Sequence, residues 1–321
     1  MQLNLRNQLQ PVGLIGLGLM GRGIASCLLS QGLEVFAYNR TVSRAQESIP
    51  HIDQALSELV ERGIIPRSRL RGWKRRFHLT STVSDLAPCR FVIETVKEDL
   101  ALKRKLYAEL EACLPATAVI ASNTSSFPIT LLQAGRKHPG RFIGMHWGEP
   151  AHIMRYLEVI PGRHTSKRTL RRTQQLGAIC GKEPTLLRED IRGFLSNRMM
   201  YAMIREAFHL VETGIADIET VDKSFRNDIG WWALLAGPFR WMDLTGIPAY
   251  ELVMEGLLPK LCNDKKVPKL MREVVASGAK GIGNAKGFYR YTNKSARRWE
   301  KDWIEFTYDM RKLADKYAVR D

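Results

Sequence analysis

A glycine-rich turn near the N-terminus constrains the fold of this chain more than any other feature. The turn, Gly16–Gly21, reads GLGLMG and directly follows an apolar strand predicted over Pro11–Leu17. A helix predicted over Met20–Ser30 leaves it. Glycines at the first, third and sixth positions permit a tight turn, let backbone N–H groups approach phosphate, and allow close helix packing. This context favours a dinucleotide pyrophosphate site over a turn without a ligand. The residues expected there are Gly16, Gly18, Leu19, Met20 and Gly21.

Short apolar strands alternate with longer amphipathic segments through the first half of the chain. Strands are predicted over Leu33–Tyr38, Phe91–Thr95, Ala118–Ala121 and Phe142–Met145, a helix over Leu100–Cys113, and further β-rich pieces over Tyr156–Ile160 and Pro184–Leu187. Such alternation predicts a parallel sheet with right-handed crossovers. We therefore expect an α/β fold, a Rossmann-type doubly wound sheet, in the N-terminal domain.

The pattern changes after Gly193. Apolar residues then recur at helical spacing over Phe194–Thr213, and Gly214 marks the end of that helix. Further helices are predicted over Ile218–Phe225, Gly237–Leu244, Pro248–Leu261 and Pro268–Ser277, with a terminal helix in the last thirty residues. The sequence therefore predicts two domains, 1–191 with the dinucleotide site and 192–321 all-helical.

Composition excludes several classes of protein. An apolar fraction of 45% with 26% charged residues is typical of a soluble globular protein. No run reaches the roughly 18 apolar residues that a membrane span requires. The five cysteines are scattered without CxxC spacing, which favours a reducing compartment over disulfides. We expect a cytoplasmic protein without a metal site or membrane association.

The formal net charge of +16 calls for an explanation. The densest basic segment, Arg67–Arg76, holds six basic residues among ten, together with Trp73. Three interpretations remain open: a solvated loop, a site for a multiply phosphorylated ligand, and nucleic-acid binding. Nucleic acid is the least favoured because no recognition-helix, RNA-binding or zinc-finger signature accompanies the charge.

The end of the second strand bears on the choice of cofactor. An NAD site usually has Asp or Glu there, which bonds the ribose hydroxyl. This chain instead has Asn39, Arg40 and Thr41. The planar cation of Arg40 suits a 2′-phosphate, which favours NADP. The alternative is NAD, with Arg40 stacked on the adenine.

A histidine and a glutamate form the candidate catalytic pair. His146 follows a predicted buried strand, and active sites of α/β proteins lie beyond the carboxyl ends of strands. Glu158 falls within an apolar strand, where an unpaired carboxylate would be costly. A glutamate bonded to the imidazole would orient it and stabilise its cation. Another histidine of the same loop, His152, competes for the catalytic role.

From Pro11 to about Tyr291 the chain resembles the short-chain L-3-hydroxyacyl-CoA dehydrogenase family. The motifs that carry the resemblance are GLGLMGRGIA at residues 16–25, IETVKED at 93–99, SNTSS at 122–126, GFLSNR at 193–198, GPF at 237–239 and GFY at 287–289. Their order and spacing together are specific.

The resemblance implies a role for several residues. It makes His146 the catalytic base and Glu158 its partner, and it places Ser125 and Asn197 against the substrate. It also implies that Glu98 and Lys103 lie on the nicotinamide side. The family's substrate is an acyl-CoA, and its helical domain forms a homodimer.

Two departures from the family pattern bear on the substrate. The family's His-Phe-Phe-Asn-Pro loop is here His-Trp-Gly-Glu-Pro, which places a carboxylate at Glu149. The Thr-Pro-Gly-Phe entry to the helical domain has become Ile-Arg-Gly-Phe, which introduces Arg192. The two residues either pair with each other or meet substrate. The segment Arg67–Arg76 takes the place where the family's helical segment helps to hold CoA, so it is a candidate site for CoA phosphates.

Three functions follow from these observations. The first is an NADP- or NAD-dependent 3-hydroxyacyl-CoA dehydrogenase. The second keeps the reaction but replaces the thioester with another 3-hydroxy acid, such as a sugar acid or a carnitine-like alcohol, because Glu149 suits a cationic or hydroxyl-rich group. The third is a nucleotide- or polyanion-binding protein without turnover, which the net charge favours and the retained catalytic motifs disfavour.

Overall fold

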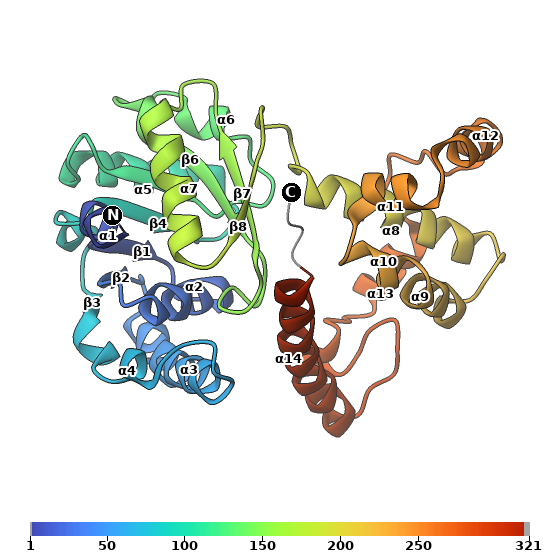
Figure 1. Cartoon of the computed structure of the whole chain (residues 1–321), viewed down its shortest axis with the longest axis horizontal. Coiled ribbons are helices and arrows are strands. Elements are labelled where there is room, and N and C mark those ends of the chain that lie inside the picture. The colour runs from blue at the N-terminus through green and yellow to red at the C-terminus, as the bar shows by residue number, and fades with distance from the viewer. Residues whose placement is uncertain (1, 318–321) are drawn as a thin grey trace. The chain divides into compact units, whose positions relative to one another are not determined.

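The computed structural model describes residues 2–317, with side chains from residue 6 onward, and divides into two compact units (Figure 1). Unit 1 comprises Met1–Asn197 and unit 2 comprises Arg198–Asp321. The domain boundary predicted between residues 191 and 192 stays a prediction.

Unit 1 is built on one eight-stranded sheet in the order β3-β2-β1-β4-β5-β6-β7-β8. The strands are β1 (Val12–Ile15), β2 (Val35–Tyr38), β3 (Phe77–Thr80), β4 (Phe91–Glu94), β5 (Val119–Ser122), β6 (Phe142–Trp147), β7 (Tyr156–Pro161) and β8 (Glu183–Leu186). Every neighbouring pair is parallel except β6 and β7, which are antiparallel. The predicted doubly wound α/β fold is therefore confirmed, but the sheet is not wholly parallel: β7 and β8, at one edge, run opposite to the other six strands.

Helices flank this sheet (Figure 1). They are α1 (Gln2–Leu9), α2 (Leu19–Ser30), α3 (Val42–Glu61), α4 (Arg67–Leu70), α5 (Leu100–Cys113), α6 (Ile129–Gln133) and α7 (Lys167–Ile179), with single 3-10 turns η1 (Trp73–Arg76), η2 (Val83–Leu86) and η3 (Pro139–Arg141). The predicted helices over Met20–Ser30 and Leu100–Cys113 are both present, as α2 and α5. A side chain caps the first turn of α5, since Asp99 accepts a hydrogen bond from the Leu102 N–H.

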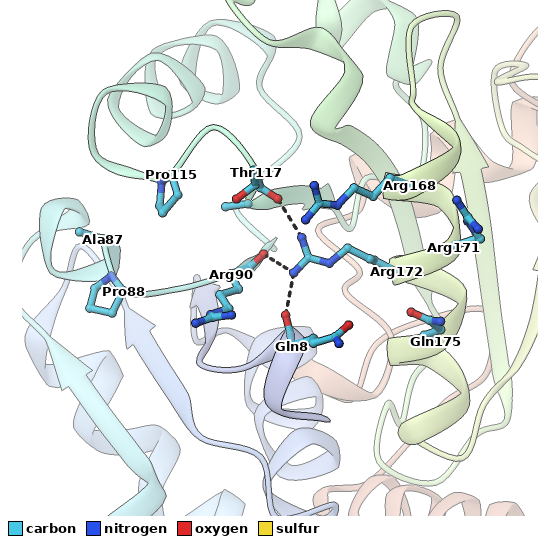
Figure 2. A pocket seen from close by; sticks show the side chains of 11 residues that line it. Gln8, Ala87, Pro88, Arg90, Pro115, Thr117, Arg168, Arg171, Arg172 and Gln175 are labelled. Atoms are coloured by element: carbon cyan, nitrogen blue, oxygen red, sulfur yellow. Dashed lines mark hydrogen bonds between the residues drawn. The ribbon is translucent and has the colours of Figure 1, made fainter. Parts of the chain in front are cut away.

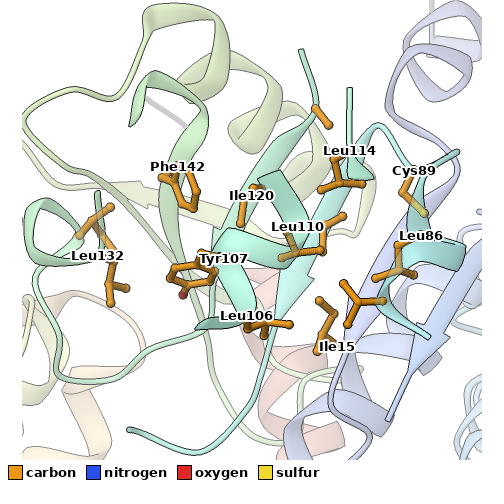
Figure 3. Close-up of a cluster of buried hydrophobic side chains, with 14 of the residues drawn as sticks. Ile15, Leu86, Cys89, Leu106, Tyr107, Leu110, Leu114, Ile120, Leu132 and Phe142 are labelled. Carbon is orange, nitrogen blue, oxygen red and sulfur yellow. The ribbon is translucent and has the colours of Figure 1, made fainter. Parts of the chain in front are cut away.

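A cluster of apolar side chains packs α5 against the middle of the sheet (Figure 3). Leu106 and Leu110 of α5 lie in it, together with Ile120 of β5. The ring of Tyr107 meets that of Phe142 edge-on, with centroids 5.3 Å apart. Each such side chain stabilises the fold by about 1.5–3 kcal/mol when fully buried. The cluster fixes α5 beside the carboxyl ends of β4 and β5, where the candidate site lies.

Unit 2 is helical, as predicted. Its helices are α8 (Ser196–Glu212), which starts in unit 1, α9 (Ile218–Asn227), α10 (Ile229–Ala233), α11 (Gly237–Thr245), α12 (Ile247–Leu257), α13 (Lys269–Ala276) and α14 (Asn293–Lys316), with 3-10 turns η4 (Leu258–Lys260) and η5 (Ile282–Asn284). Thr292 caps α14 by accepting a hydrogen bond from the Ser295 N–H. Among residues 2–317, no helix combines the length and the apolar character that crossing a membrane would need.

Candidate active site

The glycine turn joins β1 to α2 and has the geometry that its sequence predicts. Gly16 has φ of +92°, a conformation that side chains with a Cβ rarely adopt. A Cβ on Gly21 would lie 1.9 Å from the Gly16 carbonyl oxygen, so only glycine permits this approach of helix to turn. Gly18 precedes α2 and has open space where its Cβ would be, while Leu19 is exposed and Met20 half-buried. These features fit a dinucleotide phosphate set against the first turn of α2.

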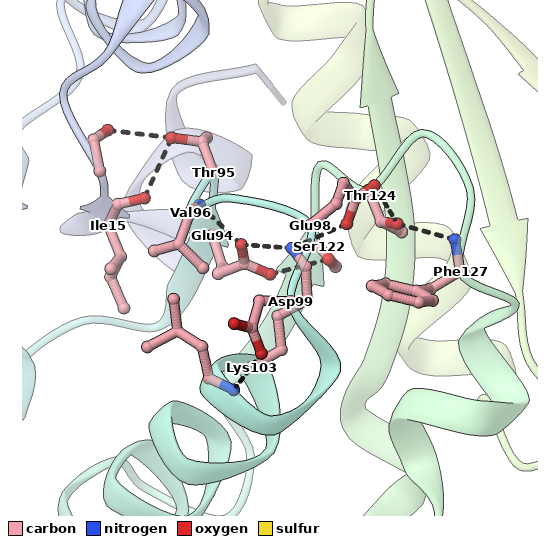
Figure 4. A network of polar contacts seen from close by, with 12 residues as sticks. Ile15, Glu94, Thr95, Val96, Glu98, Asp99, Lys103, Ser122, Thr124 and Phe127 are labelled. Carbon is pink, nitrogen blue, oxygen red and sulfur yellow. Dashed lines mark hydrogen bonds and ion pairs between the residues drawn. The ribbon is translucent and has the colours of Figure 1, made fainter.

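A threonine that the sequence analysis did not single out fastens this turn to the next strand. The Thr95 hydroxyl lies 3.1 Å from the Ile15 carbonyl oxygen and 3.0 Å from that of Gly16 (Figure 4). Thr95 follows β4 directly, so it links the carboxyl ends of β1 and β4. The one feature of the sequence that could have identified Thr95 is its position at the end of an apolar strand.

The carboxyl end of β2 is tied to the same turn. The Asn39 side-chain oxygen accepts a hydrogen bond from the Leu17 N–H at 3.0 Å, and its amide donates to the Thr41 carbonyl at 2.7 Å. Asn39 is therefore occupied by backbone partners. The neighbouring Arg40 and Thr41 are both exposed.

His146 and Glu158 meet directly across the antiparallel pair β6 and β7. The His146 Nδ1 atom lies 2.8 Å from a carboxylate oxygen of Glu158. Both residues are buried. The contact between them arises because residues opposite each other in a sheet point to the same face.

Glu158 also accepts hydrogen bonds from the chain that leads into α8. Its second oxygen receives the N–H groups of Leu195 at 3.0 Å and Ser196 at 2.9 Å. The preceding residues, Gly193 and Phe194, have φ of +81° and +52°, which turns the chain so that these N–H groups face the carboxylate. Phe194 is fully buried, and its ring lies 5.7 Å from that of His146.

These contacts decide the ionisation of Glu158. Burial alone would raise its pKa, but hydrogen bonds from His146, Tyr156 and Ser196 outweigh burial, and the pKa lies below its ordinary value. The Tyr156 hydroxyl lies 3.2 Å from His146 Nδ1, and burial together with Glu158 raises its pKa strongly. Tyr156, at the start of β7, is a second residue that the sequence analysis passed over. The pair is thus a carboxylate next to an imidazole.

A buried network lies at the ends of β4 and β5 (Figure 4). The Glu94 carboxylate receives the Lys103 amine at 2.6 Å, the Tyr107 hydroxyl at 2.6 Å and the Ser122 hydroxyl at 2.8 Å. Burial and the nearby charge of Glu94 raise the pKa of Tyr107 well above its ordinary value, so the phenol remains a donor. The Lys103 side chain is fully buried and also lies 3.5 Å from Glu98. Its predicted role in cofactor binding stays a prediction.

Glu98 connects this network to the loop after β5. It accepts hydrogen bonds from the Thr124 hydroxyl and from the Ser125 N–H, both at 2.6 Å. The Asn197 side chain in turn donates to the Ser125 carbonyl at 3.1 Å. Three residues predicted separately, Glu98, Ser125 and Asn197, therefore form one chain of contacts.

Glu149 and Arg192, the two departures from the family pattern, do not pair with each other in the described part of the chain. One carboxylate oxygen of Glu149 is buried without a hydrogen-bond partner. Burial raises its pKa, while the Ala151 N–H and the charge of Arg22 lower it by less. Arg192 is exposed in the loop before α8. Of the two alternatives that the sequence leaves open, the Glu149–Arg192 pair is therefore not formed among the described residues, and contact of either residue with substrate stays a prediction.

The basic segment Arg67–Arg76 folds as α4 and η1 around a buried Trp73, whose indole N–H donates to Asp53 at 2.9 Å. Arg76 donates to the carbonyls of Arg69 and Gly72. Arg67 and Arg71 are exposed. The segment therefore has a structural anchor and an exposed cationic side.

Comparison with known proteins places these features in a family. Residues 11–191 match the 3-hydroxyacyl-CoA dehydrogenase NAD binding domain, and residues 193–291 match the C-terminal domain of the same family. A probable 3-hydroxybutyryl-CoA dehydrogenase from Deinococcus radiodurans is 33% identical over 87% of this chain and 99% of its own length.

A second relative acts on a different kind of molecule. The 5-formyl-3-hydroxy-2-methylpyridine 4-carboxylate 5-dehydrogenase of Mesorhizobium japonicum is 32% identical over 90% of this chain and 93% of its own length. A crystal structure of an enzyme of this name, described as an NAD+ dependent dismutase, matches with a TM-score of 0.87 at 30% identity, covering 97% of this chain and 99% of that one. These matches confirm the resemblance drawn from the motifs, and the chain belongs to the 3-hydroxyacyl-CoA dehydrogenase family of NAD-binding oxidoreductases.

Proposed function

We propose that this protein transfers a hydride between a nicotinamide dinucleotide and the C3 carbon of a 3-hydroxyacyl-CoA, with His146 as acid and base. The observation that carries the proposal is the buried chain of hydrogen bonds from His146 through Glu158 to the backbone. A carboxylate that is fixed on both oxygens can hold an imidazole in one orientation. Membership of the family supports the type of reaction.

The chemistry assigned to the pair follows from its protonation. Because ionised Glu158 only accepts hydrogen bonds, the ring proton of His146 stays on Nδ1 and Nε2 keeps its lone pair. Nε2 then takes the hydroxyl proton of the alcohol as a carbonyl forms at the same carbon, and Glu158 stabilises the imidazolium. In the reducing direction Nε2 returns the proton to the carbonyl oxygen. Bound nicotinamide supplies the hydride acceptor or donor.

Other residues hold the reactants in this proposal. Gly16, Gly18 and Gly21 hold the pyrophosphate, and Glu98 with Lys103 supports the nicotinamide side. Ser125 and Asn197 contact the substrate, as the hydrogen bond between them suggests. Glu149 and Arg192 are further candidates for substrate contact, and Arg67–Arg76 for the CoA phosphates.

The test is reduction of acetoacetyl-CoA with NADH and NADPH run side by side. We expect His146→Gln to lower turnover by roughly 10²- to 10⁴-fold while dinucleotide binding, followed by fluorescence titration, persists. His164→Gln changes an exposed histidine and serves as the control. Full turnover in His146→Gln contradicts the assignment.

A second candidate keeps the reaction and changes the substrate. The similarity to the Mesorhizobium japonicum enzyme, named for a pyridine carboxylate, favours a small hydroxylated or aldehyde-bearing acid without CoA. A sugar acid or a carnitine-like alcohol belongs to the same class. Glu149 supports it, because the carboxyl oxygen that is buried without a hydrogen-bond partner can bond a hydroxyl or cationic group. Turnover of such acids with no reduction of acetoacetyl-CoA would favour this candidate.

We further propose that NADP is preferred over NAD. Arg40 is exposed beside the turn, and the end of β2 has no carboxylate to repel a 2′-phosphate. Arg40→Ala should lower kcat/KM for NADPH by about tenfold and leave NADH nearly unchanged. An equal loss for both cofactors would mean that Arg40 stacks on the adenine instead.

The proposal includes a homodimer formed through the helical unit. Unit 2 has a groove of about 690 Å³ lined by apolar side chains of α8, α9 and α13, among them Ile204, Val221 and Val274. Exposed apolar surface of this kind marks an interaction site. Light scattering of the purified protein should give the mass of two chains, and a monomer at micromolar concentration would contradict the dimer.

A further inference from the structure

The amino ends of strands β4 and β5 border a hollow of about 770 Å³ that is separate from the candidate active site. Its charged lining consists of four arginines: Arg90 directly before β4, and Arg168, Arg171 and Arg172 of α7. Within residues 2–317, no aspartate or glutamate lines it. The hollow is therefore a concave cationic surface, unlike a flat charged face.

The arginines differ in how they are held. Arg172 is anchored, because its guanidinium donates to the carbonyls of Thr117 at 2.8 Å, Gln8 at 3.0 Å and Arg90 at 3.1 Å. Arg90, Arg168 and Arg171 are exposed, and within the described residues no carboxylate forms an ion pair with any of them. Figure 2 shows the side chains of Arg168 and Arg172 reaching from α7 toward Thr117. The guanidinium groups of Arg168 and Arg172 therefore lie in the same hollow without a carboxylate to balance their charge.

The electrostatics show the cost of this arrangement. Burial lowers the pKa of Arg172, and the charges of Arg168 and Arg90 lower it further. Like charges that converge on a partly buried cation oppose folding unless an anion joins them. The three carbonyl partners satisfy hydrogen bonds of Arg172 but supply no negative charge.

The place of the hollow in the fold separates it from the dinucleotide. Arg90 precedes the first residue of β4, whereas Glu94, the last, belongs to the network at the carboxyl end. Four residues of strand span roughly 13 Å. Dinucleotide and substrate sites of doubly wound folds lie beyond the carboxyl ends of the strands, so the hollow faces the opposite edge.

We infer that this hollow binds a compact anion carrying two or more phosphoryl groups, at a site distinct from the dinucleotide turn. Guanidinium groups present paired donors that match phosphate oxygens, and several arginines together suit a multiply charged ligand. The volume falls in the range of small-molecule sites. In the part of the chain that the structure describes, no aromatic side chain lines the hollow for a base to stack on, which points to the phosphate chain as the recognised part.

The experiment is calorimetric titration of tripolyphosphate into protein already saturated with its dinucleotide, which removes binding at the glycine turn. The wild-type chain should bind one equivalent. The double variant Arg90→Gln with Arg168→Gln should bind at least about tenfold more weakly, because two charge-assisted contacts are lost. Arg172 stays unchanged, since its loss would remove the hydrogen bonds that it donates to three backbone carbonyls.

A matched control removes the same charge elsewhere in unit 1. Lys137→Gln with Arg163→Gln changes two exposed cations that do not line the hollow, and binding should stay within about twofold of wild type. If both double variants bound tripolyphosphate equally more weakly, the effect would come from the lower net charge of the protein, and the inference would be overturned. Absence of saturable tripolyphosphate binding, or binding of a short DNA duplex in its place, would overturn it as well.

Discussion

Glu158 and Glu149 are carboxylates from the same stretch of β6, its loop and β7, yet their surroundings are opposite. Glu158 receives the His146 ring nitrogen and two backbone N–H groups, and its pKa lies below the ordinary value because those contacts outweigh burial. Glu149 has a buried oxygen without a partner, and burial raises its pKa. Burial acts to raise the pKa of both carboxyls. Whether the pKa ends above or below its ordinary value depends on how many hydrogen-bond donors face the carboxylate.

The difference separates two kinds of residue in the candidate site. A carboxylate held by three donors is built to stay ionised and to orient a neighbour. A buried carboxyl with one oxygen free of donors is ready to exchange a proton or to accept a ligand group. Glu94 resembles Glu158 in receiving three hydrogen-bond donors.

The largest effect on turnover is expected from Glu158→Gln. The substitution gives position 158 a neutral side chain, like that of a protonated Glu149. The amide can no longer stabilise the imidazolium or enforce one His146 tautomer, so turnover should fall by roughly 10²- to 10⁴-fold. The measurement is kcat for acetoacetyl-CoA reduction, or for the acid that proves to be the substrate. Glu183→Gln, at an exposed position of β8, is the control. A variant with wild-type kcat would show that Glu158 has only a structural role.

An effect of intermediate size is expected from Glu94→Gln, the other carboxylate with a full set of donors. The change removes the negative charge 2.6 Å from the buried Lys103 amine and leaves Glu98, at 3.5 Å, as its remaining carboxylate partner; breaking a buried ion pair costs about 3 kcal/mol or more. The melting temperature should fall by roughly 6–10 °C. Glu109→Gln, on the exposed side of α5, should leave it nearly unchanged. An unchanged Glu94→Gln melting temperature would mean that the network contributes nothing to stability.

Much of the sheet could be predicted because each central strand is a short apolar run between turn residues. The predicted strands over Phe91–Thr95 and Phe142–Met145 are β4 and β6, each within two residues of its predicted end. Such runs are buried on both faces, so the pattern is strong. The segment over residues 42–61 was not assigned a helix, and it forms α3 with Pro50 inside it.

The antiparallel direction of β7 relative to β6 is the main feature of the sheet that the pattern of apolar residues could not predict. Apolar alternation is the same for parallel and antiparallel neighbours, so it does not give direction. The register of His146 with Glu158 depends on that direction. The pairing itself could be predicted without that direction, from the cost of an unpaired carboxylate at Glu158 and from the family resemblance.

Residues that act through backbone contacts escaped the sequence analysis. Thr95 bonds two carbonyls of the glycine turn, and the N–H groups of Leu195 and Ser196 bond Glu158. Every residue except proline has a backbone N–H, so the residue type does not reveal which N–H groups bind a side chain. Gly193, which permits the bend before Leu195, is the one residue whose type reflects this contact. Glu94 did leave a signal, since a carboxylate ending an apolar strand needs partners.

The smallest effect is expected from Glu149→Gln, and its dependence on pH is the informative part. Because the pKa of Glu149 is raised in the folded protein, the folded state holds more protons than the unfolded state above the ordinary value. The wild type therefore loses stability as pH rises from the ordinary glutamate pKa to the raised one, and keeps that deficit above it. Glu149→Gln removes the deficit, so its melting temperature relative to wild type should climb with pH by an amount on the order of 1 °C.

Glu158 provides the opposite sign in the same measurement. Its lowered pKa contributes stability that is present above the ordinary value and is lost as pH falls through the lowered one. Relative to wild type, Glu158→Gln should therefore be least harmful in acid, while Glu149→Gln gains its advantage only as pH rises. Melting curves of both variants and of Glu109→Gln across the acid range measure the two slopes. Slopes of the same sign would mean that the donors around Glu158 do not outweigh its burial, or that Glu149 acquires a partner in solution.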